Sequence, residues 1–303
     1  MFLVILLYAL FASLFSLSKL TLGYTEPFFF IGSRMLFAGI LLLGYQYFKE
    51  PSSLKISQKH WPALFMLGFL NIYLTNISEI WGLQHMHSSK ACLIYSLSPF
   101  LSALIAYPVL KETLTFKKGI GLLIGVTGVL PIFLQPNAAE PSFTVDAFLS
   151  YPEMALLTAV VCSVYGWILL KKIVSHYKHS PIVANGISMI LGGSMALWHS
   201  YLSGETWQPF PVTEWWPFLH NTLLLCVISN LICYNLYGYL LKRYSATFMS
   251  FAGLVTPLFA SLFGWLFLQE QISIYFFGSF ILFAIGLLLF YQEELKRDKI
   301  YVN

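Results

Sequence analysis

The chain has 303 residues, of which 58% are hydrophobic and 10% are charged, and its formal net charge is +4. A water-soluble domain carries roughly a quarter charged residues, so this composition excludes a protein that covers itself with polar surface. The basic residues form no stripe interleaved with aromatic residues, which argues against nucleic-acid binding. The four cysteines lie inside apolar runs without a CxxC pair, so we expect buried thiols rather than disulfides or a metal site.

Apolar runs of about 20 residues follow one another along the chain and are typical of membrane-spanning helices. In chain order we predict ten spans, at residues 2–22, 27–48, 61–84, 88–110, 117–134, 151–171, 181–202, 215–241, 246–268 and 273–291. The acidic segment 135–150 is the longest gap and would connect two five-helix halves, 1–134 and 151–303. The first run has no basic leader and no small-residue cleavage pattern, so we expect it to be a retained span. The predicted fold class is an all-α integral membrane protein.

Lysines and arginines in the predicted loops indicate the orientation of the chain. If the N-terminus lies inside, the inner loops and the C-terminal tail together hold 14 of the 17 basic residues. We therefore predict that both termini are cytoplasmic, that segment 135–150 lies outside, and that the protein belongs to the bacterial inner membrane.

An internal repeat links the two predicted halves. Pro99 in the first half is followed by Glu112, and Pro257 in the second is followed by Glu270 at the same spacing. Because each half has five predicted spans, which is an odd number, the second half must cross the membrane upside down relative to the first. Inverted repeats of this kind are typical of secondary transporters. A proline in the middle of a span kinks a helix, so Pro99 and Pro257 are predicted hinges.

Ten spans in two halves, each with a proline followed by a Leu-x-Glu signature, resemble the EamA-type branch of the drug/metabolite transporter superfamily. The signature reads Leu110-Lys111-Glu112 in the first half and Leu268-Gln269-Glu270 in the second, and the resemblance covers nearly the whole chain. It implies a basket in which spans one to four and six to nine surround a central cavity, with spans five and ten packed outside. It also implies a small-molecule substrate, and the substrates of the family include amino acids, sugars, nucleotide-linked metabolites and S-adenosylmethionine.

Two charged residues fall inside predicted spans. Arg34 lies about seven residues into the second span, and Glu79 lies at about the same depth in the third. A charge buried in a membrane is costly unless it is paired or faces water. Two interpretations stay open. Either Arg34 binds a substrate carboxylate while Glu79 binds a substrate cation, or the two side chains pair and only hold the spans together.

The third span carries a polar face, and the shift that aligns Pro99 with Pro257 pairs its Asn71 with Ser229 of the eighth span. Polar side chains in lipid must face protein or a cavity, so this face either lines a cavity or joins helices by hydrogen bonds. Aromatic residues on nearby spans can stack on a flat ring or hold a cation over a ring face. The predicted substrate-binding residues are Arg34, Glu79, Asn71, Thr75, Tyr95, Tyr165, Trp167, Asn230, Tyr234 and Tyr237.

We predict a secondary transporter, not an enzyme, that moves a small amino-acid-bearing metabolite by alternating access, without ATP, cofactor or metal. The favoured substrate is S-adenosylmethionine, exchanged for S-adenosylhomocysteine, because an arginine suits its carboxylate, a glutamate its ammonium, and aromatic rings its sulfonium and adenine. Export of an amino acid or another metabolite is the alternative within the superfamily, and an integral-membrane enzyme is the alternative outside it. We expect a lipid bilayer as the surroundings, no nucleic-acid partner, and a monomer or a homodimer.

Overall fold

The computed structural model describes residues 1–85, 94–95, 97–112, 114–133, 151–256, 258–259, 262 and 274–302. Regular structure in these residues is helical, apart from an isolated antiparallel bridge between Thr25 and Val212. The principal helices are α1 (Phe2–Thr21), α2 (Pro27–Lys49), α3 (Trp61–Leu67), α4 (Thr75–Gln84), α6 (Ser98–Leu110), α7 (Phe116–Phe133), α8 (Tyr151–Lys171), α9 (Pro181–Leu202), α10 (Trp215–Leu225), α11 (Tyr234–Leu240), α12 (Ala246–Ala252) and α14 (Ile274–Val302). The all-α class is thus confirmed, and five helical stretches of the described residues are long and apolar enough to cross a membrane.

Prolines mark the first residues of two long helices. Pro27 begins α2 and Pro181 begins α9, each directly after a residue with extended backbone, Glu26 and Ser180 respectively. A proline suits this place because the first helical amide has no partner within the helix, and the ring already holds φ near the helical value. Both starts agree with the predicted spans.

Pro99 lies in the first turn of α6, which begins at Ser98, rather than in the middle of a continuous helix. In that first turn a proline removes no hydrogen bond from a helix interior. Pro108 is the proline inside α6. Pro257 and Glu270 lie outside the described residues, so both the second hinge and the second signature stay predictions.

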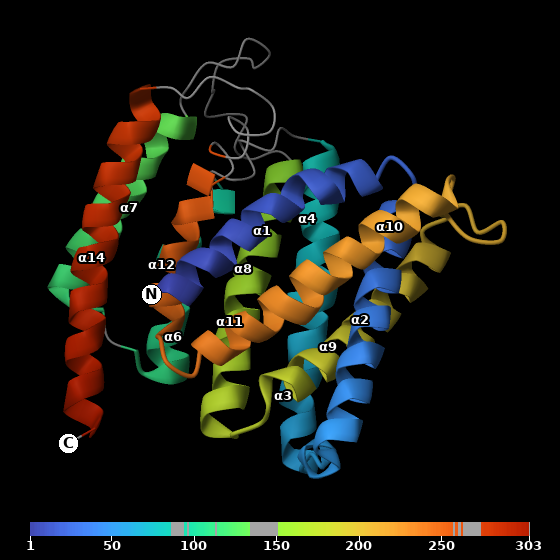
Figure 1. Cartoon of the computed structure of the whole chain (residues 1–303), viewed down its shortest axis with the longest axis horizontal. Helices are drawn as coiled ribbons and strands as arrows, with labels where there is room; N and C mark the ends of the chain where they lie inside the picture. Colours follow the sequence, from blue (N-terminus) through green and yellow to red (C-terminus); the bar gives the residue numbers. More distant parts are fainter. Residues whose placement is uncertain are drawn as a thin grey trace.

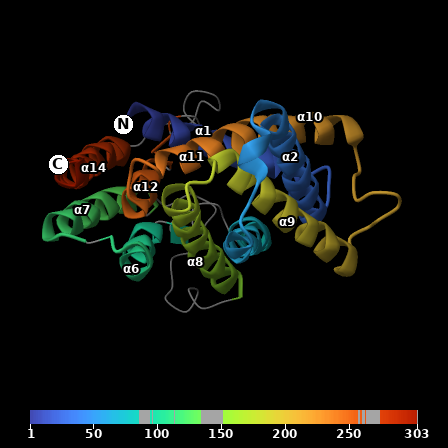
Figure 2. The same cartoon turned by 90° about the horizontal axis from the view of Figure 1, so that it is seen from below.

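Helices α2 and α9 cross in close contact (Figure 2). A Cβ atom added to Gly32 would lie 2.7 Å from α9, and one added to Gly186 would lie 2.7 Å from α2. Likewise, a Cβ atom on Gly39 would lie 2.8 Å from the carbonyl oxygen of Gly186, and one on Gly193 would lie 3.1 Å from that of Gly32. Glycine is required at such distances because any larger residue would push the two backbones apart. The contacts show that the two helices run antiparallel.

Helices α7 and α14 lie side by side at one end of the molecule in both views (Figure 1, Figure 2). Here again glycine lets the backbones approach, because a Cβ atom on Gly121 would lie 2.8 Å from the carbonyl oxygen of Gly286. The reverse distance, from a Cβ atom on Gly286 to the carbonyl oxygen of Gly121, would be 2.6 Å. This pair corresponds to the fifth and tenth predicted spans, which the family resemblance places outside the central bundle.

Three of the long described helices contain a π-helical segment, in which backbone N–H groups bond five residues back. Segment η3 (Gly68–Leu74) joins α3 to α4, and η6 (Cys226–Cys233) joins α10 to α11. Segment η5 (Lys172–His176) extends α8. A π segment carries one residue more than the α-helix that it interrupts, and such segments are frequent at functional sites.

Candidate functional site

Arg34 lies on α2 with only 7% of its surface exposed. Its Cζ atom lies 4.9 Å from the centre of the Phe30 ring, which is a cation–π contact with a residue one turn earlier. Within the described part of the chain, the Arg34 Nε atom has no hydrogen-bond partner. The guanidinium charge interacts electrostatically with Tyr234, Cys226 and Glu79. A buried guanidinium with an unused donor is chemically suited to an anionic ligand.

Glu79 lies on α4 and accepts a hydrogen bond from the Tyr95 hydroxyl, at 2.7 Å from Oε2. Among the described residues, no ion pair shorter than 4.0 Å joins Glu79 to Arg34, although their charges interact at longer range. The two side chains therefore face a common region without a direct bond. Within the described residues, neither charge is therefore held by the other in a contact ion pair.

Aromatic rings gather beside these charges, where α8 meets α11. Trp167 stacks on Tyr237 with ring centres 4.0 Å apart, and it lies 5.2 Å from the Tyr234 ring at a tilted angle. Tyr8 of α1 meets Tyr237 edge to face at 6.4 Å. Three of the predicted aromatic residues are thus brought together, whereas the half-buried Tyr165 makes no ring contact within the described residues. Tyr8 was missed because nothing in the sequence places the first span against the eighth.

Buried polar side chains lie within the π segments or directly after them. Asn71 is 2% exposed and packs against Gly166, where a Cβ atom would lie 2.4 Å from the Asn71 Cβ atom. Thr75 donates its hydroxyl to the Leu70 carbonyl at 2.7 Å. Asn230 is fully buried and donates its amide to the Met35 sulfur at 3.0 Å, while its Oδ1 atom has no partner within the described residues. The Asn230 Oδ1 atom is therefore an unused hydrogen-bond acceptor in the buried part of η6.

The hydrogen bonds correct the alignment of the third and eighth spans. The Asn76 amide donates to the carbonyls of Asn71 and Ile72, at 3.3 and 2.8 Å. The Asn235 amide donates in the same way to the carbonyls of Asn230 and Leu231, at 3.3 and 2.9 Å. The two patterns match when the predicted shift is lengthened by a single position, so Asn71 pairs with Asn230 and not with Ser229. The repeated Asn-x-x-x-x-Asn spacing was the available sequence signal.

A second buried charge, Glu112, lies just after α6 and contacts the start of α12. Its Oε1 atom accepts from the Ala246 backbone N–H at 3.0 Å and pairs with Lys171 Nζ of α8 at 3.1 Å. Its Oε2 atom accepts from the backbone N–H and the hydroxyl of Thr247, at 3.3 and 3.2 Å. Lys171 also donates to the Tyr244 carbonyl. The carboxylate therefore caps the helix N-terminus, where the exposed N–H groups and the helix dipole favour a negative charge.

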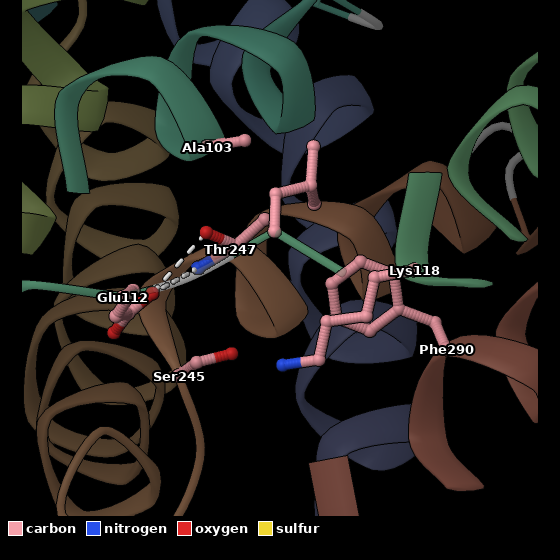
Figure 3. A pocket seen from close by; sticks show the side chains of 7 residues that line it. Ala103, Glu112, Lys118, Ser245, Thr247 and Phe290 are labelled. Atoms are coloured by element: carbon pink, nitrogen blue, oxygen red, sulfur yellow. Dashed lines mark hydrogen bonds between the residues drawn. The ribbon is translucent and has the colours of Figure 1, made fainter. Parts of the chain in front are cut away.

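Figure 3 shows the small cavity beside this carboxylate, with Glu112 bonded to Thr247 on one side and the Lys118 side chain beside the Phe290 ring on the other. The Lys118 Nζ atom lies 5.2 Å from the centre of that ring. The cavity measures about 10 Å³, which is room for one water molecule and far too little for a metabolite. This cluster is therefore a polar contact that joins the residue after α6 to α8 and α12.

Two histidines meet between the start of the third predicted span and the loop after η5. His60 Nδ1 and His179 Nε2 lie 2.7 Å apart, and the His60 ring stacks on Tyr177 with centres 4.2 Å apart. Burial, together with the neighbouring His60, lowers the pKa of His179 below its ordinary value of 6.5. The pair is consequently favoured when the His179 ring is neutral.

The EamA-like transporter family matches residues 1–134 and 151–292 of this chain. A protein of Chlamydia muridarum named S-adenosylmethionine/S-adenosylhomocysteine transporter is 39% identical over 302 residues, covering 98% of this chain and 92% of that protein. A protein of Chlamydia trachomatis with the same name is 38% identical over 308 residues, covering 100% and 92%. The uncharacterized transporter YoaV of Bacillus subtilis is 26% identical over 275 residues, covering 87% and 86%.

A solved crystal structure of a protein aligns with 97% of this chain and 96% of its own, with a TM-score of 0.77 and 15% identity. At that identity the likeness shows a shared fold alone. The family match extends over both halves, and the two Chlamydia relatives are 39 and 38% identical over almost the entire length. The chain is a multi-pass membrane protein that belongs to the EamA-like transporter family.

Proposed function

We propose that this transporter exchanges S-adenosylmethionine for S-adenosylhomocysteine across the bacterial inner membrane. The observation that carries the proposal is the similarity to two Chlamydia proteins of that name, at 39 and 38% identity over nearly the whole chain. Both ligands share an amino-acid group and an adenosyl group and differ by one methyl group and one charge at sulfur. A site for them needs an anion partner, a cation partner and aromatic surface.

Arg34 would bind the substrate carboxylate. Its guanidinium is buried and its Nε donor is unused within the described residues. A planar guanidinium can hold a carboxylate by two parallel hydrogen bonds, which a lysine ammonium cannot do.

Glu79 would face the positive groups of the substrate. Its carboxyl group accepts a hydrogen bond from a tyrosine hydroxyl and makes no ion pair with Arg34 shorter than 4.0 Å, so no contact ion pair with Arg34 competes with a ligand. The rings of Trp167, Tyr234 and Tyr237 supply stacking surface for adenine and cation–π contact for a sulfonium. Thr75 and Asn71 belong to the wall of the same proposed site.

Transport by alternating access would use two inverted halves, 1–134 and 151–303, joined by segment 135–150. The crossing of α2 and α9 supports this arrangement, because aligning Gly32 with Gly186 maps its contacts onto each other. A Cβ atom on Gly32 would meet Leu197, and the equivalent atom on Gly186 would meet Leu43, at 2.7 Å in both cases. The prolines at residues 99 and 257 stay proposed hinges of this motion.

The orientation, with both termini cytoplasmic, rests on the distribution of basic residues. A cysteine replacing Lys178, whose side chain is exposed, should resist an impermeant thiol reagent in intact cells, while one replacing Asn137 should react. Labelling at residue 178 but not at residue 137 would show that the orientation is the reverse of the one proposed.

Uptake of radiolabelled S-adenosylmethionine into proteoliposomes tests the proposed exchange. We expect uptake to be faster when the vesicles are preloaded with S-adenosylhomocysteine, because an exchanger returns loaded, whereas a channel or an enzyme shows no such acceleration. For substitutions of the buried Arg34, the matched control is Arg243→Lys. It alters an exposed arginine that donates to the Tyr239 hydroxyl, and this variant should transport as well as the original protein. Clear uptake of a plain amino acid, without uptake of S-adenosylmethionine, would discard the adenosyl substrate in favour of amino-acid transport.

A further inference from the structure

Each of the two π segments, η3 and η6, leaves one backbone carbonyl without its ordinary α-helical partner, and the two carbonyls occupy equivalent positions. In an α-helix the Asn71 carbonyl would accept from the Thr75 N–H, but that N–H bonds the Leu70 carbonyl instead. In η6 the Tyr234 N–H bonds the Ser229 carbonyl, which leaves the Asn230 carbonyl in the same situation. In a membrane interior such a carbonyl needs a partner from the protein.

The side chains of Asn76 and Asn235 supply that partner. Asn76 donates to the Asn71 carbonyl and Asn235 donates to the Asn230 carbonyl, at 3.3 Å in both segments. Each amide also reaches the next carbonyl along the chain, at 2.8 and 2.9 Å. The same side-chain hydrogen bond therefore satisfies the unpartnered carbonyl once in each proposed half, at matching positions.

A π segment decides which way the rest of its helix faces. It absorbs one additional residue, so that the helix after it keeps the orientation of an uninterrupted α-helix. If the segment relaxed to α-helix with that residue retained, everything beyond it would rotate by about 100°. Beyond η3 that rotation would move Glu79, and beyond η6 it would move Tyr234, away from Arg34, with which both interact. It would also move Tyr237 away from Trp167, on which it stacks.

We propose that Asn76 and Asn235 are positioning residues of the transport site, which hold the π segments and thereby orient Glu79 and Tyr234 towards Arg34. The Tyr234 hydroxyl lies near the Asn76 side chain, so the two segments meet at these two residues. Asn235 is fixed in turn by the Asn185 amide of α9, at 3.0 Å. The inference rests on the proposed site for its ligand and on backbone geometry for the role of the amides.

The decisive experiment pairs a substitution with a deletion. Asn235→Leu removes the amide but keeps the additional residue, so we expect a lower melting temperature and S-adenosylmethionine binding weakened at least tenfold. Deleting Ile232, a 44% exposed residue of η6, in the Asn235→Leu background removes the additional residue, so that the Asn230 carbonyl regains a backbone N–H partner four positions later. This double variant should recover binding to within about threefold of the original protein, because the flanking helices return to register.

The control is deletion of Ile40, a 55% exposed residue of α2. Helix α2 has no π segment, so this deletion removes a residue that the α-helix needs to keep its register. That deletion should abolish binding. The melting temperature without ligand is the second readout. If the double variant melts no higher than Asn235→Leu, the asparagine does not act through the π segment and the inference is overturned. If the original protein does not bind S-adenosylmethionine, the proposed substrate fails, while the melting comparison still decides the role of Asn235.

Discussion

Two of the buried charged residues, Glu112 and Arg34, differ in how far their hydrogen bonds are satisfied. Both oxygens of Glu112 are bonded, to the start of α12 and to Lys171, and the cavity beside it has room for a single water. Arg34 has an aromatic ring beneath it, an unused Nε donor among the described residues, and an acid that it does not bond directly. A buried charge whose hydrogen bonds are all made contributes to structure, whereas one with an unused donor can still bind a ligand.

This contrast predicts opposite consequences for stability and function. Replacing a bonded charge leaves its partners buried and alone, which is costly. Replacing an incompletely bonded charge relieves a burial cost and removes the binding group instead. Substitutions of Lys171, Arg34 and Glu79 test that contrast, in order of expected effect, and the smallest expected effect concerns His179.

Lys171→Ala should destabilise the protein by roughly 3–5 kcal/mol, because it leaves the Glu112 carboxylate buried without its counter-ion. The measurement is denaturant or thermal unfolding in detergent. Lys172→Ala is the matched control, since the ammonium of that neighbouring lysine lies over the Tyr177 ring at 5.9 Å, and the substitution should cost less than about 1 kcal/mol. Equal losses in the two variants would contradict a structural role for the Glu112 contact.

Arg34→Met should leave stability unchanged or raise it, while substrate binding is lost. Arg34→Lys keeps the charge but not the planar fork, so it should weaken binding by about 2 kcal/mol, or roughly thirtyfold. Melting temperature and equilibrium binding, measured on the same preparations, separate the two effects. A large drop in stability for Arg34→Met would show that Arg34 is structural like Glu112.

Glu79→Gln should weaken binding of S-adenosylmethionine more than binding of S-adenosylhomocysteine, because only the former carries a sulfonium. We expect a difference of about 1 kcal/mol, or fivefold, which competition binding can resolve. Tyr95→Phe, which removes the hydroxyl that donates to Glu79, is the companion variant and should weaken both ligands equally. If Glu79→Gln also weakens both equally, the acid faces the shared ammonium.

Acidification should lower the stability slightly through His179. Its pKa is lowered in the folded protein, so the unfolded chain binds the proton more readily, and stability falls as the pH drops below about 6.5. Above that pH the ring is neutral in both states and contributes no slope. Melting temperatures at pH 5.5 and 7.5 should differ less in His179→Gln than in the original protein. An identical pH dependence in both proteins would exclude His179 as the source.

Helix positions were the most predictable part of the fold. The predicted span 181–202 coincides with α9, because a proline at its first turn and a sustained apolar run are both local signals. The π segments were not predicted, since one additional residue hardly disturbs hydrophobic periodicity over 25 residues. Only the repeated Asn71–Asn76 and Asn230–Asn235 spacing indicated them, and it falls one position away from the shift that aligns the two prolines.

The candidate site was predictable in its charges and not in its bonds. Arg34 and Glu79 were visible because a charge inside an apolar run is conspicuous. Whether they touch depends on how α2 and α4 pack, which no local pattern determines. The bond from Glu112 to Lys171 joins the residue after α6 to α8, which lie far apart in the sequence, and it requires the tertiary fold.

The crossing of α2 and α9 has an evolutionary consequence. Gly32 and Gly39 of the first half meet Gly193 and Gly186 of the second, and each pair is spaced by seven residues. Such a contact is self-complementary, as in a two-fold symmetric dimer. If the two proposed halves arose by duplication, a half-length ancestor with these two glycines would have paired with an upside-down copy of itself before gene fusion. Fusion would then have freed each copy to specialise, as Arg34 in one half and Ser188 at the equivalent place in the other illustrate.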